Sequence, residues 1–234
     1  MHDQLDELRT DPTTCLNYRL RAGKGGQGRA PCLVLLHGVG ANERGFLDLA
    51  RQFDERLSVV LVRGPLSLGP DQYAFFQVNF TSSGPAINVG QAERARTTLT
   101  DFIGALPRLH DIHPARIWMA GFSQGGIMSA SVALTAPSKL AGFGILSGRI
   151  LPEVLPLVKP DPALAGLPAF VSHGVQDNVL GVHFAHHARQ VLDGFGLALT
   201  YREYQGGHSL NGAMAGDFMQ WLGAQLSAAS AITQ

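Results

Sequence analysis

The stretch RIWMAGFSQGGIMSA, residues 116–130, decides the fold. Its apolar start, Ile117–Ala120, predicts a buried strand, and the small residues that follow Gly126 predict the start of a helix. Between them, Gly121-Phe122-Ser123-Gln124-Gly125 leaves only a very tight turn. In this context the pattern G-x-S-x-G predicts a strained serine whose hydroxyl projects above the edge of a sheet. The alternative is an ordinary glycine-rich connection between a strand and a helix.

On both sides of this stretch, short apolar runs alternate with longer helical patterns. The predicted strands are 33–36, 57–62, 117–120, 142–146, 169–172 and 197–204, and 16–20 and 31–36 flank a glycine-rich turn at 23–28. The predicted helices are 45–56, 88–110, 124–135, 181–192 and 209–226. Such alternation predicts right-handed βαβ units and a mainly parallel sheet with helices on both faces. The 234 residues are therefore expected to form a single α/β domain, 1–234.

Three segments stand apart from this pattern. Residues 1–14 are polar and acidic and are expected to be flexible, whereas 64–86 and 149–167 are long proline-containing connections that should border the active site. The first connection carries several aromatic residues, among them Phe75 and Phe76. These two side chains are predicted to line a substrate pocket, and the alternative is that the loop only covers the sheet edge.

Composition excludes several classes of partner. Eighteen basic and eighteen acidic residues give a formal net charge of zero, so no field attracts nucleic acid or an anionic membrane. No run approaches the ~18 apolar residues of a membrane-spanning helix, and no secretory signal is evident at the N-terminus. We therefore expect a cytoplasmic protein without membrane insertion. Two buried free thiols are the favoured reading of Cys15 and Cys32, with a disulfide as the alternative.

The loop Leu36-His37-Gly38-Val39-Gly40 follows an early predicted strand. In a fold with a nucleophile elbow, backbone N–H groups from such a loop and from the residue after the serine form an oxyanion hole. Those residues are Val39 and Gln124. His37 is expected to hold the loop through its ring nitrogens rather than to act as a base.

A serine hydroxyl needs a neighbouring base, and nine histidines compete for that role. When the partners follow the serine in the order acid and then histidine, each after a strand, His208 and Asp177 meet the condition. Asp161 and Asp193 are rival acids, but they lie in a proline-rich loop and at a helix end. Ser123, Asp177 and His208 are therefore the predicted catalytic triad.

Three histidines, His183, His186 and His187, share the spacing of a helix face that can bind zinc. Other ligands are not evident, so a polar helix face is the favoured reading. The proposed chemistry requires neither a metal nor a cofactor.

With these residues in place, the chain resembles the phospholipase/carboxylesterase family of α/β-hydrolases, which includes acyl-protein thioesterases and small bacterial carboxylesterases. The resemblance rests on residues 36–42, Gly121–Gly126, 146–148, 173–177 and Gly207-His208. It implies the α/β-hydrolase fold, the triad and oxyanion residues given above, a small acyl ester or thioester as substrate, and allows a homodimer. Ala41-Asn42, where members often carry an acidic residue, and segment 64–86 depart from the family pattern, which leaves the substrate open.

Two alternatives remain at this point. The same fold can hydrolyse a lactone or an amide, although relatives that cleave dienelactones normally carry cysteine in place of Ser123. The chain can also be a catalytically silent domain that binds a small hydrophobic ligand, which would predict a damaged triad. The sequence leaves the acyl-chain length and the leaving group undecided.

Overall fold

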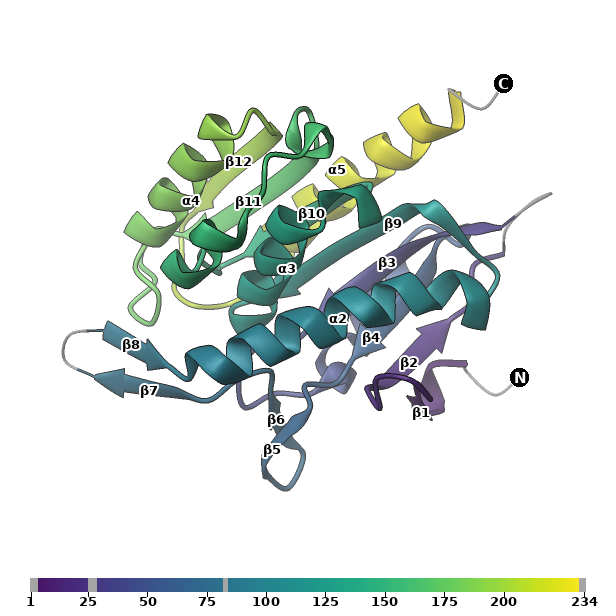
Figure 1. Cartoon of the computed structure of the whole chain (residues 1–234), viewed down its shortest axis with the longest axis horizontal. Coiled ribbons are helices and arrows are strands. Elements are labelled where there is room, and N and C mark those ends of the chain that lie inside the picture. The colour runs from purple at the N-terminus through teal and green to yellow at the C-terminus, as the bar shows by residue number, and fades with distance from the viewer. Residues whose placement is uncertain (1–3, 25–28, 82–83, 232–234) are drawn as a thin grey trace.

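The computed structural model describes residues 4–24, 29–81 and 84–231. Its centre is an eight-stranded sheet in the order β1-β2-β4-β3-β9-β10-β11-β12 (Figure 1). The strands are β1 (Arg9–Thr10), β2 (Asn17–Arg21), β3 (Ala30–Leu36), β4 (Ser58–Val62), β9 (Ile112–Phe122), β10 (Gly142–Leu146), β11 (Pro168–Gly174) and β12 (Ala198–Tyr204). From β4 to β12 neighbouring strands are parallel, whereas β2 pairs antiparallel with both β1 and β4. The predicted, mainly parallel α/β sheet is therefore confirmed.

Helices cover both faces of this sheet. The α-helices are α1 (Leu47–Gln52), α2 (Val89–Leu109), α3 (Gln124–Thr135), α4 (His183–Gly194) and α5 (Gly212–Ala231). In Figure 1, α2, α3 and α4 lie in front of the sheet and α5 lies behind it. Short 3-10 helices connect them: η1 (Gln4–Asp6), η2 (Glu43–Phe46), η3 (Pro137–Lys139), η4 (Pro152–Leu157) and η5 (Pro162–Leu164).

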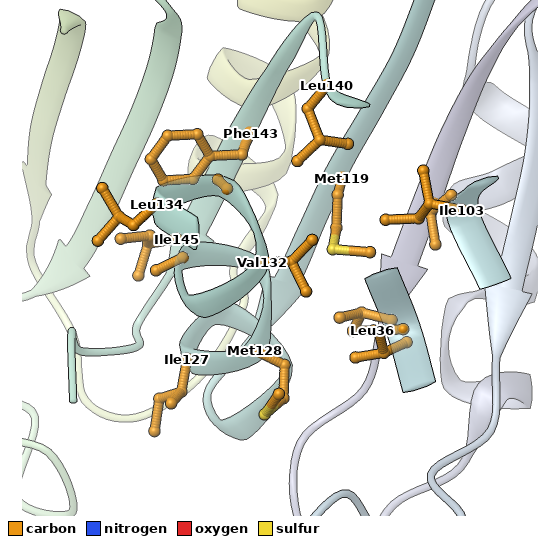
Figure 2. Packing of buried hydrophobic residues seen from close by; sticks show 14 of the residues in the cluster. Leu36, Ile103, Met119, Ile127, Met128, Val132, Leu134, Leu140, Phe143 and Ile145 are labelled. Atoms are coloured by element: carbon orange, nitrogen blue, oxygen red, sulfur yellow. The ribbon is translucent and has the colours of Figure 1, made fainter. Parts of the chain in front are cut away.

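Alternating side chains of β3 supply the two halves of the core. Val34 and Leu36 face the cluster formed with α2, α3 and α4, whereas Leu33 and Leu35 face the cluster formed with α1 and α5. Figure 2 shows the first cluster, where α3 presents Met128 and Val132 to the sheet. A strand buried on both faces must be apolar at every position, which explains the continuous apolar runs in the sequence.

The two long connections contain regular structure. Segment 64–86 forms two hairpins, β5 (Leu66–Gly69) with β6 (Gln72–Ala74) and β7 (Val78–Thr81) with β8 (Gly84–Ile87). These hairpins project from the body of the protein near the start of α2 (Figure 1). Segment 149–167 contains η4 and η5. Such two-stranded hairpins lie outside the main sheet, so they bury too little of either face to produce a clear alternating pattern.

Near the N-terminus the structure differs from the sequence-based picture. Residues 4–14 include η1 and β1, with Leu5 fully buried, so this part of the segment expected to be flexible packs on the domain. Cys32 is a buried free thiol as predicted, but the burial predicted for Cys15 is wrong. Cys15 is exposed in the turn just before β2, where its backbone adopts a φ of 59°.

Two further expectations concern single segments. Strands β2 and β3, which flank the glycine-rich turn, are separated in the sheet by β4; most of that turn, residues 25–28, lies outside the described residues. Within the described part of the chain, no helix has the length and apolar character needed to cross a membrane.

Candidate active site

Ser123 lies in the tight turn between β9 and α3. Its φ of 54° and ψ of −116° are strained for a residue with a side chain. A Cβ on Gly125 would stand 1.9 Å from the carbonyl oxygen of Leu36, and one on Gly121 would stand 2.3 Å from the carbonyl carbon of Gly125. Only glycine therefore fits on either side of the serine, and the turn has the predicted geometry.

The structure brings the three predicted triad residues together. His208 Nε2 lies 2.8 Å from Ser123 Oγ, and His208 Nδ1 lies 2.6 Å from Asp177 Oδ2. The ring of His208 packs on Phe122, with the ring centroids 5.0 Å apart. Because a carboxylate accepts the Nδ1 proton, the Nε2 lone pair is directed at the serine hydroxyl.

The Asp177 carboxylate is completely buried and fully hydrogen-bonded. Its Oδ1 accepts hydrogen bonds from the backbone N–H groups of Val179 and Leu180, at 2.9 and 2.8 Å. These contacts fix the loop after β11 and leave Oδ2 free to face His208.

His173 supports the same turn, a role that sequence reasoning missed. It is buried, its Nε2 donates to the Leu180 carbonyl oxygen at 2.6 Å, and that nitrogen lies 3.3 Å from Asp177 Oδ2. Burial lowers the pKa of His173, which favours a neutral ring beside the acid. The only signal in the sequence was a histidine on the strand that leads into the acid.

The rival acids lie elsewhere. Asp161 caps η5 by accepting a hydrogen bond from the backbone N–H of Ala163. Asp193, near the end of α4, forms an exposed ion pair with Arg189 at 3.7 Å. Neither contacts His208, so Asp177 is the carboxylate that the geometry supports.

The predicted oxyanion residues border the serine. Val39, Ser123 and Gln124 line one hollow, and a Cβ on Gly38 would stand only 3.3 Å from the Ser123 Cβ. Gln124 is also the first residue of α3, so the positive end of that helix faces the serine. The arrangement suits a negative charge that develops on a carbonyl oxygen bound there.

His37 holds its loop, as expected from its position. The backbone N–H of Gly64 donates to His37 Nε2 at 2.9 Å, and His37 Nδ1 donates to the Gly38 carbonyl oxygen at 2.7 Å. Burial lowers the pKa of His37, so the ring is neutral and its Nε2 can accept. Phe75 packs on this ring at a centroid distance of 5.3 Å.

The side chain of Gln124 has a second role that sequence reasoning missed. Its Oε1 accepts from the backbone N–H of Phe75 at 2.8 Å, and its Nε2 donates to the Phe76 carbonyl oxygen at 2.7 Å. One buried amide therefore satisfies two buried backbone groups, the Phe75 N–H and the Phe76 C=O, and joins the long connection to α3.

Sequence reasoning also missed the structural role of Glu43. Its side chain is fully buried and pairs with Arg19 at 2.9 Å and with Arg63 at 2.7 Å. Arg63 in turn lies over the ring of Tyr73, 4.5 Å from its centroid. Although burial opposes ionisation, hydrogen bonds from Arg63 and Arg19 lower the pKa of Glu43 to about 2. A single acidic residue in the loop and arginines on β2 and after β4 were the available signal.

The hollow beside Ser123 is mostly apolar. It is lined by Val39, Phe76, Val78, Pro85, Ile87, Ser123, Gln124, Ile127, Arg149, Val179 and Leu180. Of the two phenylalanines predicted to line a pocket, Phe76 lies in this lining, whereas Phe75 packs behind the loop against His37. Segment 64–86 contributes three of the lining residues, Phe76, Val78 and Pro85, so it borders the site as expected.

The histidines of α4 do not converge. His186 pairs with Glu203 at 2.8 Å, and His183 packs on Phe184. Within residues 4–24, 29–81 and 84–231, no three metal-ligating side chains come together.

Comparisons with known proteins concern the family and the fold of the chain. The family model for phospholipase/carboxylesterase matches residues 22–226. Acyl-protein thioesterase 1 of Gibberella zeae is 37% identical over 101 residues, which span 42% of this chain and 43% of that protein, less than half of its length. The putative hydrolase MhqD of Bacillus subtilis is 29% identical over 81% of this chain and 90% of its own.

Among solved structures, the carboxylesterase of Bacillus cereus superposes with a TM-score of 0.78. The match covers 91% of this chain and 96% of that one at 21% sequence identity, so it supports the shared fold. The family match extends over most of the chain and includes the elbow, the acid loop and the histidine loop. The chain therefore belongs to the phospholipase/carboxylesterase family, a family of esterases and thioesterases with the α/β-hydrolase fold.

Proposed function

We propose that the protein is a serine hydrolase that cleaves carboxylic esters or thioesters through an acyl-enzyme intermediate. The observation that carries the proposal is the continuous hydrogen-bonded chain from Asp177 through His208 to Ser123. Family membership supports the same class of reaction.

In the first step, Ser123 Oγ attacks the substrate carbonyl carbon while His208 Nε2 takes the hydroxyl proton. Asp177 keeps the His208 tautomer in place and stabilises the imidazolium. The oxyanion accepts hydrogen bonds from the backbone N–H groups of Val39 and Gln124, and each such donor contributes about 3–4 kcal/mol to transition-state stabilisation in other enzymes.

In the second step, His208 gives its proton to the departing alkoxide or thiolate, and the acyl group stays on Ser123. Water then attacks the acyl carbon while His208 takes a proton from it. Collapse of the second tetrahedral intermediate releases the carboxylic acid and restores the serine hydroxyl.

A series of p-nitrophenyl esters from acetate to palmitate tests the proposal and sizes the acyl pocket near Phe76. Hydrolysis by the native protein that disappears in Ser123→Ala supports the assignment. Equal rates in both proteins would remove Ser123 from the mechanism and favour the silent ligand-binding alternative. Labelling of Ser123 by a fluorophosphonate gives an independent readout of an activated serine.

Two further properties belong to the proposal. We place the protein in the cytoplasm, since both cysteines are free and Cys15 is exposed, which fits a reducing compartment. The homodimer that the family resemblance allows stays a prediction, and light scattering at several protein concentrations checks it.

A further inference from the structure

The apolar hollow beside Ser123 contains one cationic group. Arg149 is the charged residue of that lining, which otherwise consists of apolar side chains, Ser123 and Gln124. The residue is partly buried, and burial lowers the pKa of its guanidinium. An arginine in such surroundings stays charged at neutral pH, so the hollow contains a poorly solvated positive charge.

Most of the hydrogen-bonding capacity of Arg149 is unused. One donor, Nη2, contacts the Pro85 carbonyl oxygen at 3.3 Å, a long hydrogen bond. The buried Nε has no partner in the described structure. The guanidinium lies over the ring of Phe184, 5.0 Å from its centroid, which holds its plane but satisfies no N–H group.

No carboxylate in the described part of the chain forms an ion pair with this guanidinium. Glu153, an exposed residue of η4, acts on Arg149 only at a distance. Elsewhere in the protein a buried acid can hold two arginines, as Glu43 does with Arg19 and Arg63. Arg149 differs from Arg19 and Arg63 because no acid among the described residues forms an ion pair with it.

The backbone directs Arg149 to this position. Strand β10 ends at Leu146, and Ser147 then adopts a φ of 50°, a strained value for serine. Gly148 follows so close to the elbow that a Cβ there would stand 3.0 Å from the Ser123 carbonyl oxygen. Arg149 therefore follows directly after a residue that packs against the elbow. Its side chain reaches the hollow that Ser123 lines.

We propose that Arg149 determines substrate specificity by binding a carboxylate that the substrate carries close to its scissile ester or thioester bond. The inference rests on the proposed serine hydrolase function and adds a substrate class to it: monoesters or monothioesters of dicarboxylic acids, or esters of hydroxy acids. Both classes place a carboxylate in the hollow. In the first class the acyl half of the substrate carries it, and in the second class the alcohol half carries it.

A carboxylate fits this site better than a phosphate. Two parallel N–H···O bonds can join the planar guanidinium to a carboxylate, and the single charges then cancel. A phosphate monoester carries close to two negative charges at neutral pH, and one arginine in an apolar hollow would leave part of that charge unpaired.

The test compares kcat/KM for monomethyl succinate, glutarate and adipate with matched methyl esters in which an isopropyl group replaces the carboxylate. A second arm compares the butyrate esters of glycolate and of its neutral amide. The native protein should prefer the anionic member of one arm. In Arg149→Met the ratio of anionic to neutral kcat/KM should fall by about 10- to 100-fold. Arg149→Lys should retain part of the preference.

Arg189→Met is the matched control, since Arg189 also lies over an aromatic ring, that of Tyr201 at 5.3 Å, but is not part of the hollow. It should keep the native ratio. If Arg149 only packs on Phe184 and Pro85, its replacement lowers both rates equally, the ratio stays constant and the inference is overturned. Hydrolysis of neutral esters that depends on Ser123 would then leave the proposed function standing.

A binding measurement separates the two proposals completely. Calorimetry with Ser123→Ala and monomethyl glutarate should detect binding that Arg149→Met weakens about tenfold or more in the double variant. The butyrate ester of glycolate, which carries its carboxylate on the alcohol half, is titrated into the same variants in parallel. Absence of binding by every anionic ester, or equal affinity in both variants, would overturn the carboxylate assignment whatever the hydrolysis assays show.

Discussion

Gly125 lies directly against the end of β3, so close that an added Cβ would stand 1.9 Å from the carbonyl oxygen of Leu36. The contact joins the first turn of α3 to the strand that leads into the oxyanion loop. Because both partners are backbone atoms, no side-chain rotation can relieve a clash at this place.

Gly125→Ala should therefore unfold or severely destabilise the protein, by more than about 4 kcal/mol. Gly216→Ala, in α5 where an added Cβ meets nothing within 4 Å, is the matched control and should gain about 0.5–1 kcal/mol from helix propensity. Urea denaturation followed by circular dichroism measures both. Equal stability of the two variants would contradict the close approach.

Asp177→Asn should lower kcat about 10⁴-fold. The amide nitrogen cannot accept the His208 Nδ1 proton, so the histidine loses the tautomer that accepts from Ser123. Asp193→Asn, at the exposed rival acid, should leave the rate at the native value. Steady-state hydrolysis of a p-nitrophenyl ester checks both, and comparable losses in the two variants would count against the assignment of the acid.

Gln124→Ala retains the backbone N–H of residue 124 but should weaken the attachment of residues 75–76 to α3. The Phe75 N–H and Phe76 C=O would lose their partner in a buried place, at a cost of about 1–3 kcal/mol for each unsatisfied group. Hydrogen exchange should accelerate at the Phe75 amide. Gln52→Ala, on the exposed surface of α1, is the control, and unchanged exchange at Phe75 in Gln124→Ala would remove the amide from this role.

Glu43 should make the stability of the protein sensitive to acid. Its folded pKa of about 2 lies below the ordinary value of 4.5, so the pair with Arg19 and Arg63 contributes fully above pH 4.5. That contribution, on the order of 3 kcal/mol, is lost as the pH falls from 4.5 through about 2.

Glu43→Gln leaves two arginines without their buried counter-charge and should cost about 3–5 kcal/mol at pH 7. The difference from the native protein should shrink as the pH falls below 4.5, because the native carboxylate then becomes neutral as well. Denaturant melts at several pH values measure it, and a difference independent of pH would show that Glu43 acts by packing alone.

Local sequence patterns predicted most of the fold and the arrangement of the proposed triad. The elbow at Ser123 is determined by neighbouring glycines, and the parallel order of the strands follows from their connections. His208 and Asp177 could be identified because both follow strands that end at the same edge of the sheet. These features depend on short segments and on the order of elements along the chain.

What the sequence did not predict depends on contacts between distant segments. The Gln124 side chain binds backbone atoms 48 and 49 residues away, and Glu43 joins arginines 24 and 20 residues from it. No local pattern distinguishes such a glutamine or glutamate from an exposed one. Cys15 was expected to be buried, but it is exposed in the turn before β2, where its φ is 59°.

The position of β12 has a consequence for how activity is lost. The strand forms one margin of the sheet and pairs only with β11 among the described strands, and the loop behind it carries His208. Marginal strands are released by local opening at lower free energy than central ones. His208 is therefore carried by a part of the molecule that can separate while Ser123 remains embedded at the centre. Inactivation by mild denaturant should precede loss of the fold and be reversed on dilution.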